Sequence, residues 1–469
     1  MRGGHVSPAP RNRASVTAMT RRQLLALTCY WASAATTAAG QHKMAPLTVP
    51  SPAAPPAGNA DITLRIGEMT LDLAPGRSIR TLAYNGQVPG PLLRARQGRP
   101  LIVDVWNDSK DDDIVHWHGL HIPPEVDGSY EEGTPGVPPN GGRQRYVFTP
   151  DPAGSRWYHS HTVAGRNLRK STYSGQFGMF IVEANDEAGA YDQEVPILLH
   201  EWDGRFDSRG EVEFKLFSIN GKMLGAGDPI RVKPSQRVLF RIVNASATLH
   251  HRLALPGHLF NVVALDGNPV PSPARVPILD LGPGERIDAV VEMNRPGVWV
   301  LGELRADQRV GGMGIAVEYS GQQGVPRWEL PRPFVWDYGM FGGREPVPEP
   351  DGRLTMAFRA TGDGHRWTIN GKSYPRTDPI VVQAHKRYRW TFDNQSADPH
   401  PIHLHRHRFE IVRLAGQPVS GVWKDVVMVP AWQQVEVDVP TTQPGLSLFH
   451  CHQQFHMDMG FMAMMRYSD

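Results

Sequence analysis

One arrangement of turns and strands occurs three times in this chain, and it constrains the fold more than any other feature. Each copy begins with an Asn-Gly turn, continues through β-rich segments and closes with an Asn-x-Ser turn. Asn-Gly favours a tight hairpin because both residues tolerate positive φ. This order of elements is that of a Greek-key sandwich. The opening asparagines are Asn85, Asn220 and Asn370, and the closing ones are Asn107, Asn244 and Asn394.

The repeat predicts an all-β protein of three tandem Greek-key β-sandwich domains, at residues 59–185, 191–330 and 353–469. The chain has 469 residues and is 40% hydrophobic, which is enough for several cores. Its 47 glycines and 42 prolines interrupt the β-rich segments at short intervals, as turns of a sandwich do. The formal net charge of +2 gives no reason to expect a nucleic-acid partner.

The N-terminal segment differs from the repeat. In "TRRQLLALTCYWASAATTAAG" the pair Arg21-Arg22 precedes an apolar stretch and small residues, which predicts a twin-arginine export signal within residues 1–45, together with the start of a linker. The alternative, a membrane anchor, is disfavoured because about a dozen apolar residues are too few to span a bilayer. We therefore expect a periplasmic or extracellular protein with no membrane span, in which Cys29 is removed and Cys451 is the remaining cysteine.

Ten of the 20 histidines lie in four short clusters, all in the first and third copies of the repeat. In the second copy the corresponding positions hold Ala254, Pro256, Gly302 and Leu304. Histidines needed only for folding should recur in all copies, so this contrast separates function from fold. The clusters are His116 and His118; His159 and His161; His400, His403 and His405; and His450, Cys451, His452 and His456.

The spacing of these clusters points to copper. His-x-His on a strand places both imidazoles on one face, because side chains alternate with period two. Neutral imidazoles suit copper, and a thiolate with further histidines suits a copper electron-transfer centre. The alternatives are a zinc site, which closes at four ligands, and plain core histidines. In "HCH" Cys451 points away from His450 and His452, so a short covalent path joins the two kinds of site.

The four motifs, in this order and in the first and last of three cupredoxin-like domains, resemble those of the multicopper oxidases: laccases, bacterial copper-resistance oxidases and bilirubin oxidases. The resemblance covers nearly the whole mature chain. It implies four copper ions and the four-electron reduction of dioxygen to water. By this resemblance the type 1 copper binds His400, Cys451 and His456, and the type 2 copper binds His116 and His403. The type 3 pair binds His118, His159 and His452 on one ion and His161, His405 and His450 on the other.

Two residues carry the expected catalytic roles, Cys451 as electron path and Asp127 as proton donor. Asp127 matches the acidic residue that in this family lies near the copper cluster, where oxygen reduction consumes protons. Its alternative role is that of a turn residue before Gly128. Many relatives carry a glutamate directly after the second type 1 histidine. Here Met457 holds that position and Asp458 follows, so the second proton path is left open.

The axial position of the type 1 site is expected to hold Phe461. Relatives with an axial thioether have methionine there, whereas here the methionine comes one place later, as Met462. A shift of one residue turns a strand side chain to the opposite face. The alternative is a local bulge that returns Met462 to the copper. The histidines His250, His251, His258 and His407 are expected to be packing or surface residues.

The electron donor is the least constrained part of the prediction. Copper-efflux relatives carry a Met-rich insertion before the last motif. In this chain the segment between His407 and His450 has a single methionine, Met428. The C-terminal "HMDMGFMAMMRY" has five methionines, which read more naturally as core. Phenols and aromatic amines are therefore the first choice of donor and metal ions such as Cu(I) the second. A copper-free envelope scaffold of the same fold is a distant alternative. We expect a monomer.

Overall fold

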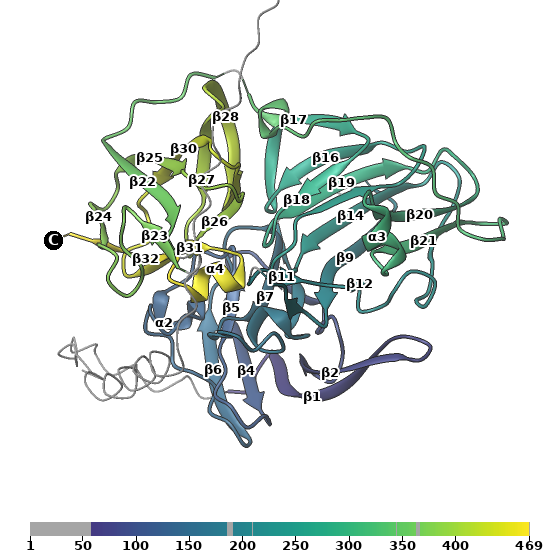
Figure 1. Ribbon diagram of the computed structural model, residues 1–469, viewed down its shortest axis with the longest axis horizontal. Coiled ribbons are helices and arrows are strands. Elements are labelled where there is room, and N and C mark those ends of the chain that lie inside the picture. Colours follow the sequence, from purple (N-terminus) through teal and green to yellow (C-terminus); the bar gives the residue numbers. More distant parts are fainter. Residues whose placement is uncertain (1–57, 185–190, 209, 344, 363–365, 469) are drawn as a thin grey trace, which may run out of the picture. The chain divides into compact units, whose positions relative to one another are not determined.

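The computed structural model describes residues 58–184, 191–208, 210–343, 345–362 and 366–468. The predicted export signal, with Arg21, Arg22 and Cys29, lies outside these residues. Strands form nearly all of the regular structure in the described part of the chain and build two main sheets in each of three domains (Figure 1). The predicted fold class is confirmed.

Domain 1 is a sandwich of two four-stranded sheets. The first has the order β2-β1-β4-β6, with β1 (Ile62–Ala74), β2 (Arg77–Tyr84), β4 (Leu101–Asn107) and β6 (Gly142–Phe148). The second has the order β3-β8-β7-β5, with β3 (Leu93–Arg96), β5 (Val115–His118), β7 (Gly154–Ser160) and β8 (Phe177–Glu183). The short helices α2 (Pro124–Asp127) and η1 (Ser171–Tyr173) lie in its connections.

Domain 2 has a six-stranded sheet of order β12-β9-β14-β19-β16-β17 and a five-stranded sheet of order β13-β21-β20-β15-β18. The strands of the first are β9 (Gln193–Trp202), β12 (Leu216–Ile219), β14 (Arg237–Asn244), β16 (Phe260–Leu265), β17 (Asn268–Val276) and β19 (Arg286–Glu292). The second holds β13 (Ile230–Val232), β15 (His251–Ala254), β18 (Leu279–Leu281), β20 (Val298–Glu303) and β21 (Gly314–Tyr319). A small hairpin, β10 (Arg205–Phe206) with β11 (Val212–Glu213), and helix α3 (Ala306–Val310) complete it.

Domain 3 repeats this topology strand for strand. Its sheets have the orders β23-β22-β25-β30-β27-β28 and β24-β32-β31-β26-β29. The first holds β22 (Gly352–Ala360), β23 (Trp367–Ile369), β25 (Arg387–Asn394), β27 (Phe409–Leu414), β28 (Gln417–Lys424) and β30 (Gln434–Pro440). The second holds β24 (Ile380–Val382), β26 (His400–Leu404), β29 (Val426–Val429), β31 (Ser447–Cys451) and β32 (Met462–Tyr467). Helix η2 (Tyr338–Phe341) precedes the domain and α4 (Gln454–Asp458) lies before its last strand.

The three Asn-Gly turns have the same local structure, as the sequence repeat predicts. Asn85, Asn220 and Asn370 have φ of 53°, 52° and 51°, and the glycine after each also has positive φ. This is the type I′ geometry that suits a two-residue hairpin. Each asparagine side chain also accepts a hydrogen bond from a neighbouring backbone N–H, that of Arg65, Leu198 and Ala357 respectively.

Strand alternation directs one face of β5 to the core and the other to the neighbouring domain. Trp117 is fully buried among the aromatic side chains of domain 1, including Tyr146 and Phe180. His116 and His118, on either side of it, point the opposite way, toward domain 3. In the described residues, no helix has the length and apolar character that a membrane crossing requires.

Candidate metal centre

Eight of the cluster histidines meet where domain 1 contacts domain 3. The pairing of β5 with β7 places His116 opposite His159, and the pairing of β26 with β31 places His403 opposite His450. Rings from the two domains then stack. The ring centroids of His116 and His405 are 3.9 Å apart. We call this group the histidine octet: His116, His118, His159, His161, His403, His405, His450 and His452.

Ring nitrogens of the octet converge. His405 Nε2 lies 3.1 Å from His450 Nε2, and His161 Nε2 lies 3.5 Å from the same atom. His452 Nε2 lies 3.3 Å from His118 Nδ1. Buried nitrogens whose lone pairs converge cannot all hydrogen-bond to each other, but they can all bind a metal ion placed between them. Four further buried nitrogens have no hydrogen-bond partner: Nε2 of His116, His159 and His403, and Nδ1 of His452.

The second nitrogen of most of these rings is fixed by an acceptor. A carbonyl oxygen only accepts, so a ring nitrogen in contact with it carries the proton and the other nitrogen keeps its lone pair for the octet. His118 is reversed, because its Nε2 contacts Asp425 Oδ1 at 3.0 Å and its Nδ1 faces the octet. The Nδ1–carbonyl distances are 3.0 Å for His116 to Asp127, 2.9 Å for His159 to Ser160, 2.7 Å for His403 to Asp425 and 2.8 Å for His450 to Cys451.

The protonation of the octet also fits metal binding. Each of its side chains is at most 6% exposed. Burial, with a smaller contribution from His116, lowers the pKa of His450 to about 3. Neutral imidazole is the form that binds a metal. Burial likewise lowers the pKa well below its ordinary value for His118, His159, His161, His403, His405 and His452.

Cys451, His400 and His456 form a separate group in domain 3, which we call the thiol trio. Cys451 Sγ lies 3.8 Å from His400 Nδ1 and 3.7 Å from His456 Nδ1. Ser396 Oγ lies 2.9 Å from His400 Nε2 and fixes that ring. The ring of Trp367 lies 4.5 Å from that of His400 and 4.4 Å from that of His456. Burial raises the pKa of the Cys451 thiol, so a bound cation would be needed to hold the thiolate.

Phe461 lies on the same side of β31 as Cys451. Its ring is 5.0 Å from that of His400, and its carbonyl accepts the Cys451 N–H at 3.1 Å. Met462 pairs with His450 in the strand register and packs against Leu448 on the opposite side. The predicted register is therefore confirmed: Phe461 faces the trio and Met462 does not.

Asp127 touches the octet from the end of α2. It is fully buried, and its Oδ2 lies 2.9 Å from His405 Nδ1 and 3.1 Å from His116 Nδ1. Its Oδ1 is buried without a hydrogen-bond partner. The turn role is present as well, because Gly128 closes α2 with φ of 109°. Contact with two cluster histidines goes beyond what a turn needs.

Glu132 is a second carboxylate at the octet, and the sequence did not single it out. Its Oε2 lies 3.3 Å from His405 Nδ1 and its Oε1 accepts the Leu448 N–H at 2.8 Å. Burial and then the charge of Asp127 raise the pKa of Glu132. Glu131 instead binds Ser129. Nothing in "SYEEG" tells which of the two adjacent glutamates points inward.

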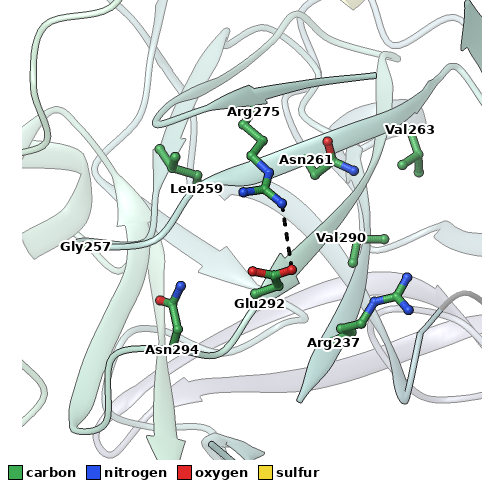
Figure 2. A pocket seen from close by; sticks show the side chains of 9 residues that line it. All are labelled: Arg237, Gly257, Leu259, Asn261, Val263, Arg275, Val290, Glu292 and Asn294. Carbon is green, nitrogen blue, oxygen red and sulfur yellow. Dashed lines mark ion pairs between the residues drawn. The ribbon is translucent and has the colours of Figure 1, made fainter. Parts of the chain in front are cut away.

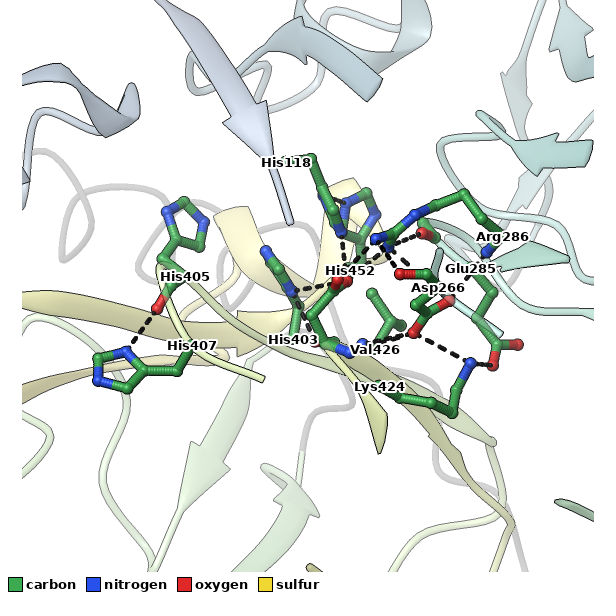
Figure 3. A network of polar contacts seen from close by, with 12 residues as sticks. His118, Asp266, Glu285, Arg286, His403, His405, His407, Lys424, Val426 and His452 are labelled. Carbon is green, nitrogen blue, oxygen red and sulfur yellow. Dashed lines mark hydrogen bonds and ion pairs between the residues drawn. The ribbon is translucent and has the colours of Figure 1, made fainter. Parts of the chain in front are cut away.

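Domain 2 has no member of the octet but fixes its edge (Figure 3). Arg286 Nη2 lies 2.6 Å from Asp425 Oδ2, and the other oxygen of Asp425 contacts His118. Arg286 is fully buried, as is Asp266, whose Oδ2 lies 3.0 Å from Lys424 Nζ. This buried ion network ties the three domains to one side of the histidines. The only hint in the sequence is the charged pair Lys424-Asp425 within an apolar strand region.

Gly284 of domain 2 also lies against the octet. A Cβ on Gly284 would lie 2.8 Å from Cδ2 of His452, so a side chain there would displace the ring. Gly284 has φ of 85°, which further disfavours other residues.

Other polar residues named from the sequence lie outside the octet. Asp458 accepts from the backbone N–H groups of Ala164 and Gly165, at 3.0 and 2.7 Å, and burial raises its pKa to about 6. His407 contacts the His405 carbonyl at 3.0 Å and Tyr467 Oη at 3.1 Å, as a packing residue does.

A hollow of about 560 Å³ on domain 2 has no part in this site (Figure 2). Arg275 and Glu292 form an ion pair of 3.7 Å across it. Its lining shares no residue with the octet or the trio: Arg237, Gly257, Leu259, Asn261, Val263, Arg275, Val290, Glu292 and Asn294.

Comparison with known proteins places this geometry in context. Family models described as multicopper oxidase match residues 66–187, 194–310 and 348–469. The multicopper oxidase MmcO of Mycobacterium tuberculosis is 30% identical over an alignment that covers 84% of each chain. A laccase of Cryphonectria parasitica is 25% identical over an alignment that covers 81% of this chain and 77% of the laccase.

Solved structures agree with the sequence relatives. The crystal structure of a multi-copper oxidase from Pseudomonas thermotolerans superposes with a TM-score of 0.70 at 26% identity. The match covers 87% of this chain and 100% of that one.

Proposed function

The chain belongs to the multicopper oxidase family of copper oxidoreductases that use oxygen, and we propose that it oxidises phenol-like or aromatic amine donors one electron at a time. The observation that carries this proposal is the adjacency of two different ligand groups in the sequence, at the end of β31. Cys451 belongs to the thiol trio, and its neighbours His450 and His452 belong to the octet. Electrons accepted at the trio thus have a covalent path of a few bonds to the octet.

The residues fit copper in both groups. We propose one type 1 ion at the thiol trio and three ions at the octet, with the ligand assignment that the sequence resemblance implies. The geometry supports two of these sites, because the ligand atoms of each lie within 4.8 Å of one another. The first consists of His400, Cys451 and His456, and the second of His161, His405 and His450. When bound, the copper ions supply one-electron acceptance from the donor and four-electron reduction of dioxygen to water.

The carboxylates beside the octet are suited to proton delivery. Dioxygen reduction consumes protons in a site from which water is largely excluded. Asp127 Oδ1 is the atom free to carry a proton, because Asp127 Oδ2 is held by His405 and His116. Glu132 Oε2 contacts the same His405 nitrogen and offers a second position on the path.

The packing of the methionines favours an organic donor. Soft thioethers gathered at a surface would indicate Cu(I) as the substrate. Met428 packs against Gly282 of domain 2. The methionines of the C-terminal segment all belong to hydrophobic clusters or pack against them, which accounts for their presence: Met457, Met462 and Met465 in the clusters, and the partly buried Met459 and Met464 against them.

Export by the twin-arginine route and a monomeric state are further parts of the proposal. The motif Arg21-Arg22 supports export of an already folded protein. Replacement of both arginines by lysine should leave the protein in the cytoplasm, as fractionation and immunoblotting would show. Export of that variant at the normal level would contradict this route.

Two measurements test the proposed reaction. Metal analysis of the purified protein should give about four copper ions per chain, since type 1, type 2 and type 3 sites together require that number. The kcat/KM measured from oxygen consumption should then be higher with a phenol as electron donor than with Cu(I). If the protein binds four copper ions but has the higher kcat/KM with Cu(I), the donor is a metal ion and not an organic compound. A folded chain that binds no copper would indicate a scaffold.

A further inference from the structure

Domain 2 contains, strand for strand, the position that the thiol trio occupies in domain 3. In both domains the closing asparagine of the repeat binds the next serine. The Ser246 N–H donates to Asn244 Oδ1 at 3.1 Å, and the Ser396 N–H donates to Asn394 Oδ1 at 3.0 Å. The strand after this turn is β15 in domain 2 and β26 in domain 3. Residues can therefore be matched by hydrogen bonds and register, without reliance on sequence identity.

His251 stands where domain 3 has His400. His251 pairs with Leu281 of β18, and His400 pairs with Val429 of β29. Ser246 Oγ lies 2.9 Å from His251 Nε2, which is also the distance from Ser396 Oγ to His400 Nε2. The two imidazoles thus have the same strand position and the same serine partner.

Glu303 stands where domain 3 has Cys451. Glu303 pairs with Leu253, two residues after His251, as Cys451 pairs with Ile402, two residues after His400. The Glu303 N–H donates to the Met313 carbonyl at 3.0 Å, and the Cys451 N–H donates to the Phe461 carbonyl at 3.1 Å. Met313 therefore matches the axial residue.

Gln308 stands where domain 3 has His456. Each is the third residue of a five-residue helix, α3 or α4. The Gln308 carbonyl accepts the Met313 N–H at 3.0 Å, and the His456 carbonyl accepts the Phe461 N–H at 3.1 Å. Gln308 is only 5% exposed, and its buried Oε1 has no hydrogen-bond partner.

We propose that domain 2 retains the ligand frame of a mononuclear metal site, at His251, Glu303, Gln308 and Met313, in which a hydrogen bond takes the place of the metal. His251 Nδ1 lies 3.1 Å from Glu303 Oε2. This is the same ring nitrogen that His400 directs at Cys451. The inference concerns domain 2 alone and does not depend on the donor proposed above.

The replacement of ligands explains why the frame is closed in the native chain. The Glu303 carboxylate accepts the backbone N–H groups of Arg252 and Arg305, at 2.9 and 3.2 Å, besides contacting His251. One imidazole with a carboxylate and an amide oxygen is a weaker ligand set for copper than two imidazoles and a thiolate. The hydrogen bond between His251 and Glu303 is therefore more stable than the binding of a metal ion by the same two residues. Restoring an imidazole at the position of Gln308 should reverse this balance.

The first test is the single substitution Gln308→His. It creates a set of two imidazoles and a carboxylate, which binds Zn(II) well in proteins. The copper-loaded variant, incubated with Zn(II) and then freed of excess metal, should hold one more zinc per chain than the native protein. Gln308→Leu is the matched control, because leucine is similar in size and has no ligand atom. Gln308→Cys repeats the test with a smaller ligand if imidazole does not fit.

The second test uses colour and needs no zinc. In a Cys451→Ser background, which lacks the thiolate of domain 3, the pair Glu303→Cys and Gln308→His should restore intense blue absorption and one copper per chain. The pair Glu303→Ser and Gln308→His should remain colourless. The proposal is overturned if variants that retain the native circular dichroism gain neither zinc nor blue copper, or if the native chain and Gln308→Leu take up zinc equally with Gln308→His.

Discussion

Domains 2 and 3 have the same strand order in both sheets but hold different chemistry at the same positions. Where domain 3 has the buried trio His400, Cys451 and His456, domain 2 has a hydrogen bond from His251 to Glu303. Ligands and hydrogen bonds are alternative ways to satisfy the same buried positions.

Domain 2 nevertheless contributes to the copper centre through charge and shape. Arg286 holds Asp425, which in turn holds His118, and Gly284 leaves room for His452. The difference between the domains is therefore one of role: domain 3 holds the proposed ligands, and domain 2 fixes the orientation of His118 and leaves room for His452. The following predictions test that division.

The largest effect is expected from equivalent serine substitutions in the two domains. Cys451→Ser should abolish the blue absorption and the oxidase activity while the chain stays folded, because serine has nearly the shape of cysteine but is a poor copper ligand. Glu303→Ser should instead keep the colour and lower the free energy of unfolding by about 1–3 kcal/mol, since buried donors lose their acceptor. Visible absorption and denaturant unfolding of both variants provide the check. A blue Cys451→Ser variant would refute the assignment of the trio.

A large effect is also expected at the octet, from Asp127→Asn. Asparagine keeps the shape and an oxygen acceptor for His405 but cannot donate the carboxylic proton. Reoxidation of the reduced enzyme by dioxygen should slow by about 10²–10⁴-fold, the usual contribution of general acid catalysis. Anaerobic reduction of the type 1 site by a phenol, followed by stopped flow, should be unchanged. Equal slowing of both steps would assign Asp127 a structural role.

The contribution of domain 2 can be measured with Asp425→Asn. This change removes the charged partner of buried Arg286, and breaking such a pair costs about 3–5 kcal/mol of unfolding free energy. Copper bound at the octet should fall as well, because a neutral amide oxygen holds the His118 Nε2–H less firmly than the carboxylate does.

The matched control is Glu329→Gln in the exposed pair Arg295–Glu329, whose side chains are 40% and 52% exposed. Its loss should cost about 0–1 kcal/mol. An Asp425→Asn variant with normal stability and copper content would show that domain 2 acts only as a spacer.

The smallest effect is expected at the axial position. Phe461→Met should lower the type 1 reduction potential, because a thioether donor stabilises the oxidised ion, and should slow oxidation of difficult donors. Redox titration of the blue band measures this. Met462→Leu, on the opposite side of the strand, and Met313→Leu, at the equivalent position of domain 2, should leave the potential unchanged. A shift with Met462→Leu and none with Phe461→Met would contradict the observed register.

Much of this site follows from strand periodicity in the sequence. His116 and His118 share a face because they are two residues apart, and Phe461 and Met462 face opposite ways because they are adjacent. Glu132 and Asp425 could not be found in this way. Their roles depend on contacts with His405 and His118, far away in the sequence, and no local pattern encodes such contacts.

By itself, the sequence determined the repeated sandwich, the absence of the histidine clusters from domain 2 and the candidate copper ligands, because turn residues and side-chain alternation are local properties. Only the tertiary structure decided which nitrogen of His118 faces the octet and that Arg286 binds Asp425, the partner of His118. It also decided that His251 and Glu303 stand where domain 3 has His400 and Cys451. These features arise where strands from different domains, or different parts of one domain, are packed together. Burial makes them matter, since every polar atom removed from water there must find a partner or a metal ion.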